Sequence, residues 1–135
     1  MALIWKSGYT TGVPELDQQH EQVFTHLNEL EARIARGEFN SPEVDESLKI
    51  LGKHVMRHFS DEECCMDRHH CPMALKNKQE HEEFLNQFVD FMTRFSQDQS
   101  LTLLREFHTM AENWMHEHIA FVDIHLRSSV ESTRG

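Results

Sequence analysis

The chain has 135 residues, 39% of them hydrophobic, and a formal net charge of −10. This length and apolar fraction suit one compact domain whose core needs no disulfides. The negative charge argues against nucleic acid or an anionic membrane surface as a partner, because both are negatively charged themselves.

Four segments place apolar residues or histidines at alternating steps of three and four, which is typical of a helix stripe that faces a bundle core. The first stripe spans residues 16–34 and stops at Gly37. The second opens with Ser41 as N-cap and Pro42 in the first turn, and it continues over residues 44–66. These patterns predict the first two helices.

The second half of the chain repeats this pattern. A break at residues 67–71 precedes Pro72, which favours a helix start, and the third stripe spans residues 74–95. The polar residues 96–100 are predicted to end the third helix, and the fourth stripe covers residues 101–125. Connections this short make neighbouring helices antiparallel, so the predicted fold is all-α, an up-down-up-down antiparallel four-helix bundle.

The two ends of the chain are predicted to differ from the bundle. The first dozen residues, with Trp5 and Tyr9, are expected to form an N-terminal arm that packs along the helices. We expect the domain to comprise residues 1–127, with residues 128–135 as a polar tail or the start of a linker to another domain.

Histidine is the unusual feature of the composition, with 11 in the chain. Imidazole is the commonest metal ligand, so a metal site is the first hypothesis. Polar residues interrupt the apolar stripes at six positions, where they would be costly if unsatisfied. These positions are His20, His58, Glu62, Asn77, His81 and His118.

The depth of these residues in the bundle decides whether they can meet. The distance of each stripe histidine from the nearest helix connection can be counted at about 1.5 Å per residue. By this count the four histidines lie at the same depth to within about one turn. One layer thus receives an imidazole from each helix, and Glu62 follows His58 at i+4 spacing. Four imidazoles with carboxylates that can bridge fit two iron or manganese ions.

Asp123 is the candidate second bridge, five residues after His118. Regular α-helical geometry would turn it about 140° away from His118, so we expect a distorted or π-type turn between the two. The alternatives to this metal site are a buried polar network, pH-sensing histidines without metal, and structural zinc. Zinc would favour four closed ligands, usually thiolates, whereas this set has six and its cysteines lie elsewhere.

The motifs together resemble the bacterial hemerythrin family over nearly the whole chain. The matching residues are Trp5, Gly12, the run Leu16-Asp17-Gln18-Gln19-His20, Asn28, His58-Phe59, Glu62-Glu63, Met66, Pro72, His81, Phe84-Leu85, Trp114, His118-Ile119 and Asp123. The resemblance implies a site with two non-haem iron ions per chain and a bridging oxo, hydroxo or water ligand. It implies that one iron binds dioxygen reversibly.

The resemblance also implies a role for each position. His20 and His58 would hold the iron that takes dioxygen, His81 and His118 would hold the other, and Glu62 and Asp123 would bridge them.

The chain departs from the family pattern at Asn77, where the family has another histidine ligand. Three roles are open for Asn77: a weak ligand through its amide oxygen, orientation of a water, or a vacant coordination position. Our hypothesis is that the missing imidazole favours fast oxidation by dioxygen over stable reversible carriage.

The leading functional interpretation is a domain that binds dioxygen or a related small ligand and senses oxygen or redox state, alone or as the sensory domain of a longer signalling protein. The alternatives are a reversible oxygen carrier or store, and a di-iron peroxide or nitric oxide reductase. We favour a binding module over an enzyme. The N-terminus lacks a secretory signal and the cysteine number is odd, so we expect a cytoplasmic protein without a membrane span.

The remaining candidates are weaker. One cluster at or close to the break between the second and third helices could bind a second metal or form a disulfide, although a solvated loop is favoured: Cys64, Cys65, His69, His70 and Cys71. His69 or His70 could instead supply the missing ligand. His108 is interpreted as a core or bundle-end residue, and His54 as either a partner of the site or a surface residue. Solvated or bundle-end positions are expected for His26, His116 and His125.

Overall fold

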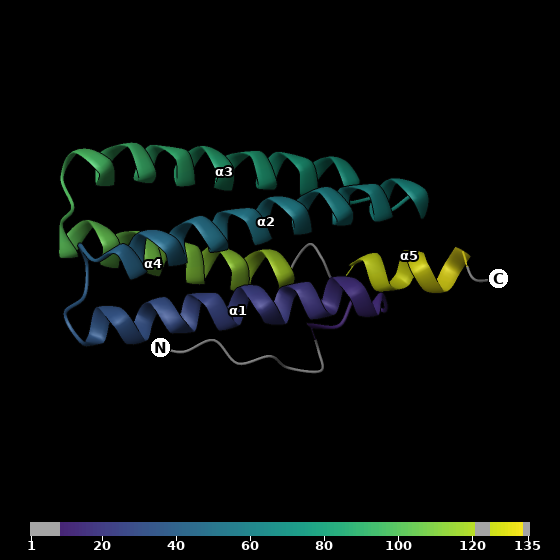
Figure 1. Cartoon of the computed structure of the whole chain (residues 1–135). Coiled ribbons are helices and arrows are strands. Elements are labelled where there is room, and N and C mark those ends of the chain that lie inside the picture. Colours follow the sequence, from purple (N-terminus) through teal and green to yellow (C-terminus); the bar gives the residue numbers. More distant parts are fainter. Residues whose placement is uncertain (1–8, 121–124, 134–135) are drawn as a thin grey trace.

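The computed structural model describes residues 9–120 and 125–133, and within them every regular element is a helix (Figure 1). The helices are α1 Pro14–Ala35, α2 Pro42–Arg68, α3 Ala74–Gln97, α4 Leu101–His118 and α5 His125–Thr133. Helices α1 and α3 each pack against α2 and α4, so the first four helices form a four-helix bundle in which consecutive helices are antiparallel. The predicted up-down-up-down bundle is confirmed.

Local signals account for where the helices begin and end. The Ser41 hydroxyl accepts a hydrogen bond from the Val44 N–H (3.2 Å), and the Ser100 hydroxyl caps α4 in the same way. Gly37 lies two residues after the end of α1 and adopts a φ of 79°, a conformation that glycine tolerates without strain. Helix α3 begins at Ala74, two residues later than Pro72 suggested, because Pro72 lies in the preceding turn.

Two groups of buried apolar side chains lie on either side of a polar layer. The large apolar cluster fills the end of the bundle near the α1–α2 and α3–α4 connections: Val23, Phe24, Leu27, Leu30, Ile34, Val44, Leu48, Leu51, Val55, Phe59, Phe84, Phe88, Phe91, Phe95, Leu104, Phe107, Ala111, Met115 and Ile119. The small apolar cluster lies toward α5: Leu16, Cys65, Met66, Cys71, Leu126 and Val130.

The C-terminal segment is helical. Residues 128–135 were predicted to be a polar tail or the start of a linker, and the structure places α5 at His125–Thr133. Leu126 and Val130 are spaced by one helical turn, and both are buried in the small apolar cluster. This single apolar pair gives a mostly polar segment one face to bury, which explains why it is helical.

The described end of the N-terminal arm packs on the bundle as predicted. The Tyr9 ring contacts Phe24 edge-on at 6.3 Å between centroids, and its hydroxyl lies 3.1 Å from His116 Nδ1. Arg127 Nε donates to the Thr10 carbonyl (2.9 Å), which joins the arm to α5. Trp5, the other residue predicted for the arm, lies outside the described residues.

Candidate metal centre

The polar layer contains one histidine from each of the four bundle helices and the carboxylate of Glu62. His20 comes from α1, His58 and Glu62 from α2, His81 from α3 and His118 from α4. All five side chains are at most 3% exposed. The structure therefore brings together the residues that the sequence placed at one depth.

The two oxygens of Glu62 face different pairs of histidines. Oε2 lies 3.3 Å from His20 Nε2 and 3.1 Å from His58 Nε2. Oε1 lies 3.0 Å from His81 Nε2 and 3.7 Å from His118 Nε2. The layer is thus divided into a first half, His20 and His58, and a second half, His81 and His118, with one carboxylate between them.

Electrostatics keep Glu62 ionised although it is fully buried. Burial alone would raise the pKa of this carboxyl group. The charge of His58 and hydrogen bonds from His118, His20 and His58 outweigh that effect and hold the pKa of Glu62 well below its usual range. An ionised, buried carboxylate is the form that binds a cation.

Asn77 lies in the second half of the layer and is fully buried. Its Oδ1 lies 2.8 Å from His118 Nε2, and the Nε2 atoms of His81 and His118 are 3.1 Å apart. The amide oxygen is thus directed at the same space as the two imidazoles. The candidate second half therefore offers two nitrogens and one neutral oxygen besides Glu62.

The hydrogen-bond pattern fits bound cations. His58, His81 and His118 each have oxygen acceptors near both ring nitrogens, with Glu62 or Asn77 on the Nε2 side. Protonation of all three rings would satisfy this pattern without metal, but it would bury three imidazolium charges around one buried carboxylate, which is costly. Metal ions on the Nε2 side satisfy the same arrangement with neutral rings.

Asp123, the predicted second bridge, lies outside the described residues. Residues 119–120, directly after His118, form a π-helical turn. The predicted π-type turn is thus present, and the placement of Asp123 stays a prediction.

Three outer hydrogen-bond partners of the histidines were missed by the sequence analysis. Gln19 Oε1 accepts from His58 Nδ1 (2.9 Å), Glu63 Oε2 accepts from His81 Nδ1 (3.0 Å), and Glu80 Oε2 accepts from His118 Nδ1 (2.6 Å). Each partner is supplied by the helix that precedes its histidine in the chain. Each of the three directly neighbours a residue of the layer, and Gln19 and Glu63 also belong to the motifs that resemble the hemerythrin family.

Aromatic rings cover the second half of the layer. Phe59 stacks on His81 with ring centroids 3.7 Å apart, and Trp114 stacks on His118 at 4.4 Å. Both rings also contact Phe84. Apolar surroundings limit the access of water to metal ligands and strengthen the electrostatic interactions among them.

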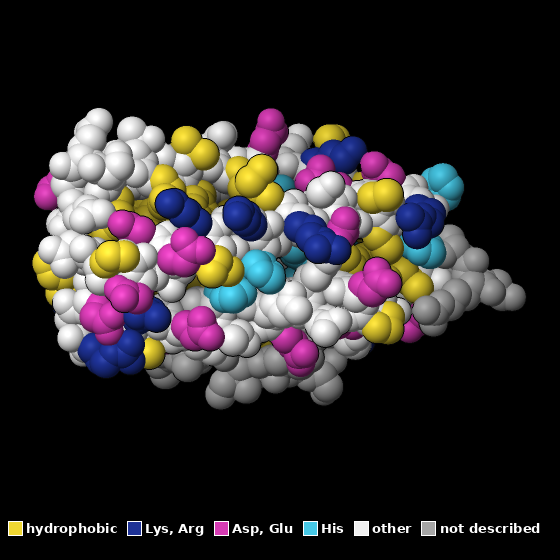
Figure 2. Space-filling view, in the orientation of Figure 1, with side chains coloured by type: hydrophobic (Ala, Val, Ile, Leu, Met, Phe, Trp, Pro, Cys, Tyr) yellow, Lys and Arg dark blue, Asp and Glu magenta, His cyan; other side chains and the backbone are white. Residues whose placement is uncertain are grey.

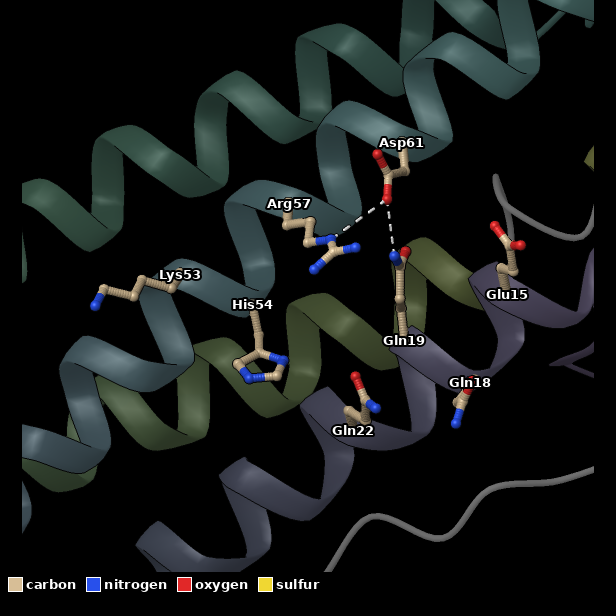
Figure 3. A pocket seen from close by; sticks show the side chains of 8 residues that line it. All are labelled: Glu15, Gln18, Gln19, Gln22, Lys53, His54, Arg57 and Asp61. Carbon is tan, nitrogen blue, oxygen red and sulfur yellow. Dashed lines mark hydrogen bonds and ion pairs between the residues drawn. The ribbon is translucent and has the colours of Figure 1, made fainter.

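A polar groove of about 450 Å³ lies on the surface between α1 and α2 (Figure 3). Asp61 lies between Arg57 Nε (3.9 Å) and Gln19 Nε2 (2.9 Å), and Gln19 contacts the buried His58 with its other amide atom. One amide therefore separates the groove from the layer. Acidic and basic side chains are interspersed over this face (Figure 2).

The other candidate histidines lie away from the layer. His108 is buried and its Nε2 donates to the Leu27 carbonyl (2.8 Å), which agrees with the predicted core position. Glu31 and Glu112 lie close enough to His108 to form another group that could hold a metal ion. The His108 imidazole, however, already has this backbone partner. His54 lines the surface groove and contacts the His26 ring at 4.6 Å.

The cysteines are less exposed than the predicted solvated loop implied. All three are free thiols, and only Cys64 is exposed, whereas Cys65 and Cys71 are buried in the small apolar cluster. Burial raises the pKa of the Cys65 thiol. His69 and His70 line a surface pocket near α5, and no cysteine belongs to a candidate metal group within the described part of the chain.

Comparison with known proteins agrees with this geometry. The sequence profile of the hemerythrin HHE cation binding domain matches residues 11–126. The chain belongs to this family. Its members are non-haem iron proteins that bind dioxygen.

Individual relatives cover most of the chain at low identity. A bacteriohemerythrin of Methylococcus capsulatus is 27% identical over 125 residues, which are 91% of this chain and 93% of the relative. One of Stenotrophomonas maltophilia is 27% identical and one of Pseudomonas aeruginosa 23%, each over 87% of this chain and 74% of the relative. Of the helices in the described residues, none is both long and apolar enough to cross a bilayer.

Proposed function

We propose that this hemerythrin domain holds two iron ions in the polar layer, binds dioxygen or a related small ligand there, and acts as an oxygen or redox sensor. The division of the imidazoles by Glu62 is the observation that supports two ions. Each carboxylate oxygen faces its own pair of Nε2 atoms, at 3.0–3.7 Å. That is the arrangement expected of a bridging carboxylate.

The proposed ligands follow from this division. His20 and His58 would hold one ion, His81 and His118 the other, with Glu62 and Asp123 as bridges. Bound iron would supply a centre that binds dioxygen and exchanges electrons with it. The chain's own contribution is to fix the imidazoles and to surround them with apolar rings.

Asn77 supports sensing rather than carriage. An amide oxygen is a weaker donor than imidazole, so the second half has an open or weakly held position. We therefore expect dioxygen to oxidise the reduced centre rapidly. The free thiols suit a reducing compartment such as the cytoplasm.

A reversibility experiment tests this proposal. Protein loaded with ferrous iron in the absence of air should change its absorption spectrum within seconds of mixing with air, and the reduced spectrum should return only after a reductant is added. Asn77→His, which restores the third imidazole, should slow this change. Recovery of the reduced spectrum of the unmodified protein on simple removal of air would show an oxygen carrier instead.

The open position at Asn77 also favours a second candidate, reduction of peroxide or nitric oxide. Catalytic turnover distinguishes a reductase from a sensor. A reductase would consume peroxide or nitric oxide steadily with an electron donor. A sensor would show no turnover above free iron but a redox-dependent change in hydrogen exchange of α5, which packs on Leu16 and Met66 within one turn of His20 and Glu62.

A further inference from the structure

Behind His81 and His118 of the second half lie carboxylates, whereas behind His58 of the first half lies a neutral amide. In the second half, His81 and His118 donate from Nδ1 to the carboxylates of Glu63 and Glu80, at 3.0 and 2.6 Å. In the first half, His58 donates to the neutral amide oxygen of Gln19 at 2.9 Å. The group behind the imidazole therefore differs between His58 in the first half and the two histidines of the second half, and only the second half also contains Asn77.

A carboxylate behind a ligating imidazole has two physical effects. It fixes the tautomer, so that Nε2 presents its lone pair to the metal, and it makes the ring a stronger donor. An amide oxygen fixes the tautomer in the same way but adds no charge. Carboxylate partners should thus strengthen metal binding more than Gln19 does.

The half with two carboxylates is also the half that lacks one imidazole of the family pattern. Asn77 Oδ1 lies beside His118 Nε2, where the sequence resemblance expects a histidine. We propose that Glu63 and Glu80 are positioning residues whose negative charge strengthens His81 and His118 as donors and so retains the metal ion of the second half despite Asn77. This inference rests on the proposed two-metal site.

The surroundings of both carboxylates permit this role. Their side chains are only 30% and 29% exposed, so solvent screens them less than a fully exposed charge. Lys76 Nζ lies 3.8 Å from Glu80 Oε1, while Oε2 of the same carboxylate contacts His118. Glu80 thus keeps one oxygen for the imidazole while the other faces a lysine.

Glu83 offers a matched control for Glu80. It lies one turn further along α3 and lines the same surface pocket, which also includes Trp114 and His118. Glu83→Gln and Glu80→Gln remove the same charge from the same helix. Only the second variant removes a carboxylate that accepts a hydrogen bond from a histidine of the layer.

The test measures zinc binding as a diamagnetic probe of the same donors. Metal-free protein labelled with ¹⁵N-histidine is titrated with zinc against a competing chelator, and the Nε2 chemical shifts show which rings bind each ion. In Glu80→Gln we expect the ion seen by His81 and His118 to bind about 10–100-fold more weakly. The ion seen by His20 and His58 should change by less than about fivefold, the size of a surface-charge effect.

A second variant, Glu63→Gln, should show the same selective loss through His81. Circular dichroism checks that each variant keeps its helix content. Equal weakening by Glu80→Gln and Glu83→Gln, equal weakening of both ions, or no weakening by either Glu63→Gln or Glu80→Gln would overturn the proposal. An unmodified protein that binds fewer than two ions would instead contradict the two-metal site itself.

Discussion

The large apolar cluster and the polar layer are built on the same four helices but have opposite effects on stability. In the cluster, rings such as Phe91 and Phe107 stack at 4.1 Å and are almost fully buried, which stabilises the fold. In the layer, four imidazoles and Glu62 are equally buried, yet burial of polar groups is costly without partners. The proposed metal ions would therefore stabilise the layer, whereas the cluster needs no ligand.

The largest effect that separates the two regions is expected from Glu62→Gln. This variant removes the charge that faces both pairs of histidines, so both ions should bind more than about 100-fold more weakly, beyond the usual effect of an outer hydrogen-bond partner. Metal analysis after dialysis measures this, with Glu46→Gln, an exposed position on the same helix, as control. Retention of two ions by Glu62→Gln would show that the layer is not the site.

The converse variant is Phe107→Ala in the large apolar cluster. It should lower the free energy of unfolding of the metal-free protein by about 3–5 kcal/mol, because it leaves a cavity beside Phe88 and Phe91. Urea unfolding measures this, and exposed Val89→Ala should change stability by less than about 0.5 kcal/mol. Metal content per folded chain should not change. A selective loss of metal would mean that the two regions are not independent.

A smaller effect is expected in the small apolar cluster. Val130→Ala removes buried surface from α5 and should destabilise the protein by about 1.5 kcal/mol. Hydrogen exchange of α5 amides should accelerate more than exchange in α3. Uniform acceleration in both helices would show that α5 unfolds only together with the whole bundle.

The smallest effect concerns the surface beside the layer. Burial, together with the charge of His54, lowers the pKa of His26 in the folded protein, against the opposing effect of Glu29. The unfolded chain therefore binds more protons near pH 6.5, so this residue's contribution to stability is present above that pH and is lost as the pH falls toward the folded pKa.

The check for His26 is urea unfolding of His26→Gln and of the unmodified protein across pH 5–8. The variant should lose less stability on acidification than the unmodified protein, while the exposed His125→Gln should not differ from it. An identical pH dependence for His26→Gln and the unmodified protein would show that His26 does not contribute to the loss of stability on acidification.

Helix stripes and caps were sufficient to predict the four-helix bundle. Polar interruptions at one depth, such as His58 and His81, also predicted which residues meet in the layer. Both follow from helical period and rise, which depend on sequence spacing alone.

Other features depended on contacts between helices. Glu63 and Glu80 lie off the apolar stripes, and which imidazole each contacts depends on side-chain direction across a helix pair. The helical state of residues 128–133 depends on one apolar pair, Leu126 and Val130, whose partners come from α1, α2 and the α2–α3 connection. Such partners cannot be assigned before the bundle is assembled.

We propose above that the polar layer holds two iron ions. Metal analysis of protein reconstituted with iron without air, with an ultraviolet-visible spectrum before and after exposure to air, tests this most directly. We predict two irons per chain and new ligand-to-metal absorption in the near ultraviolet after air. One zinc ion per chain with a featureless spectrum would contradict the account.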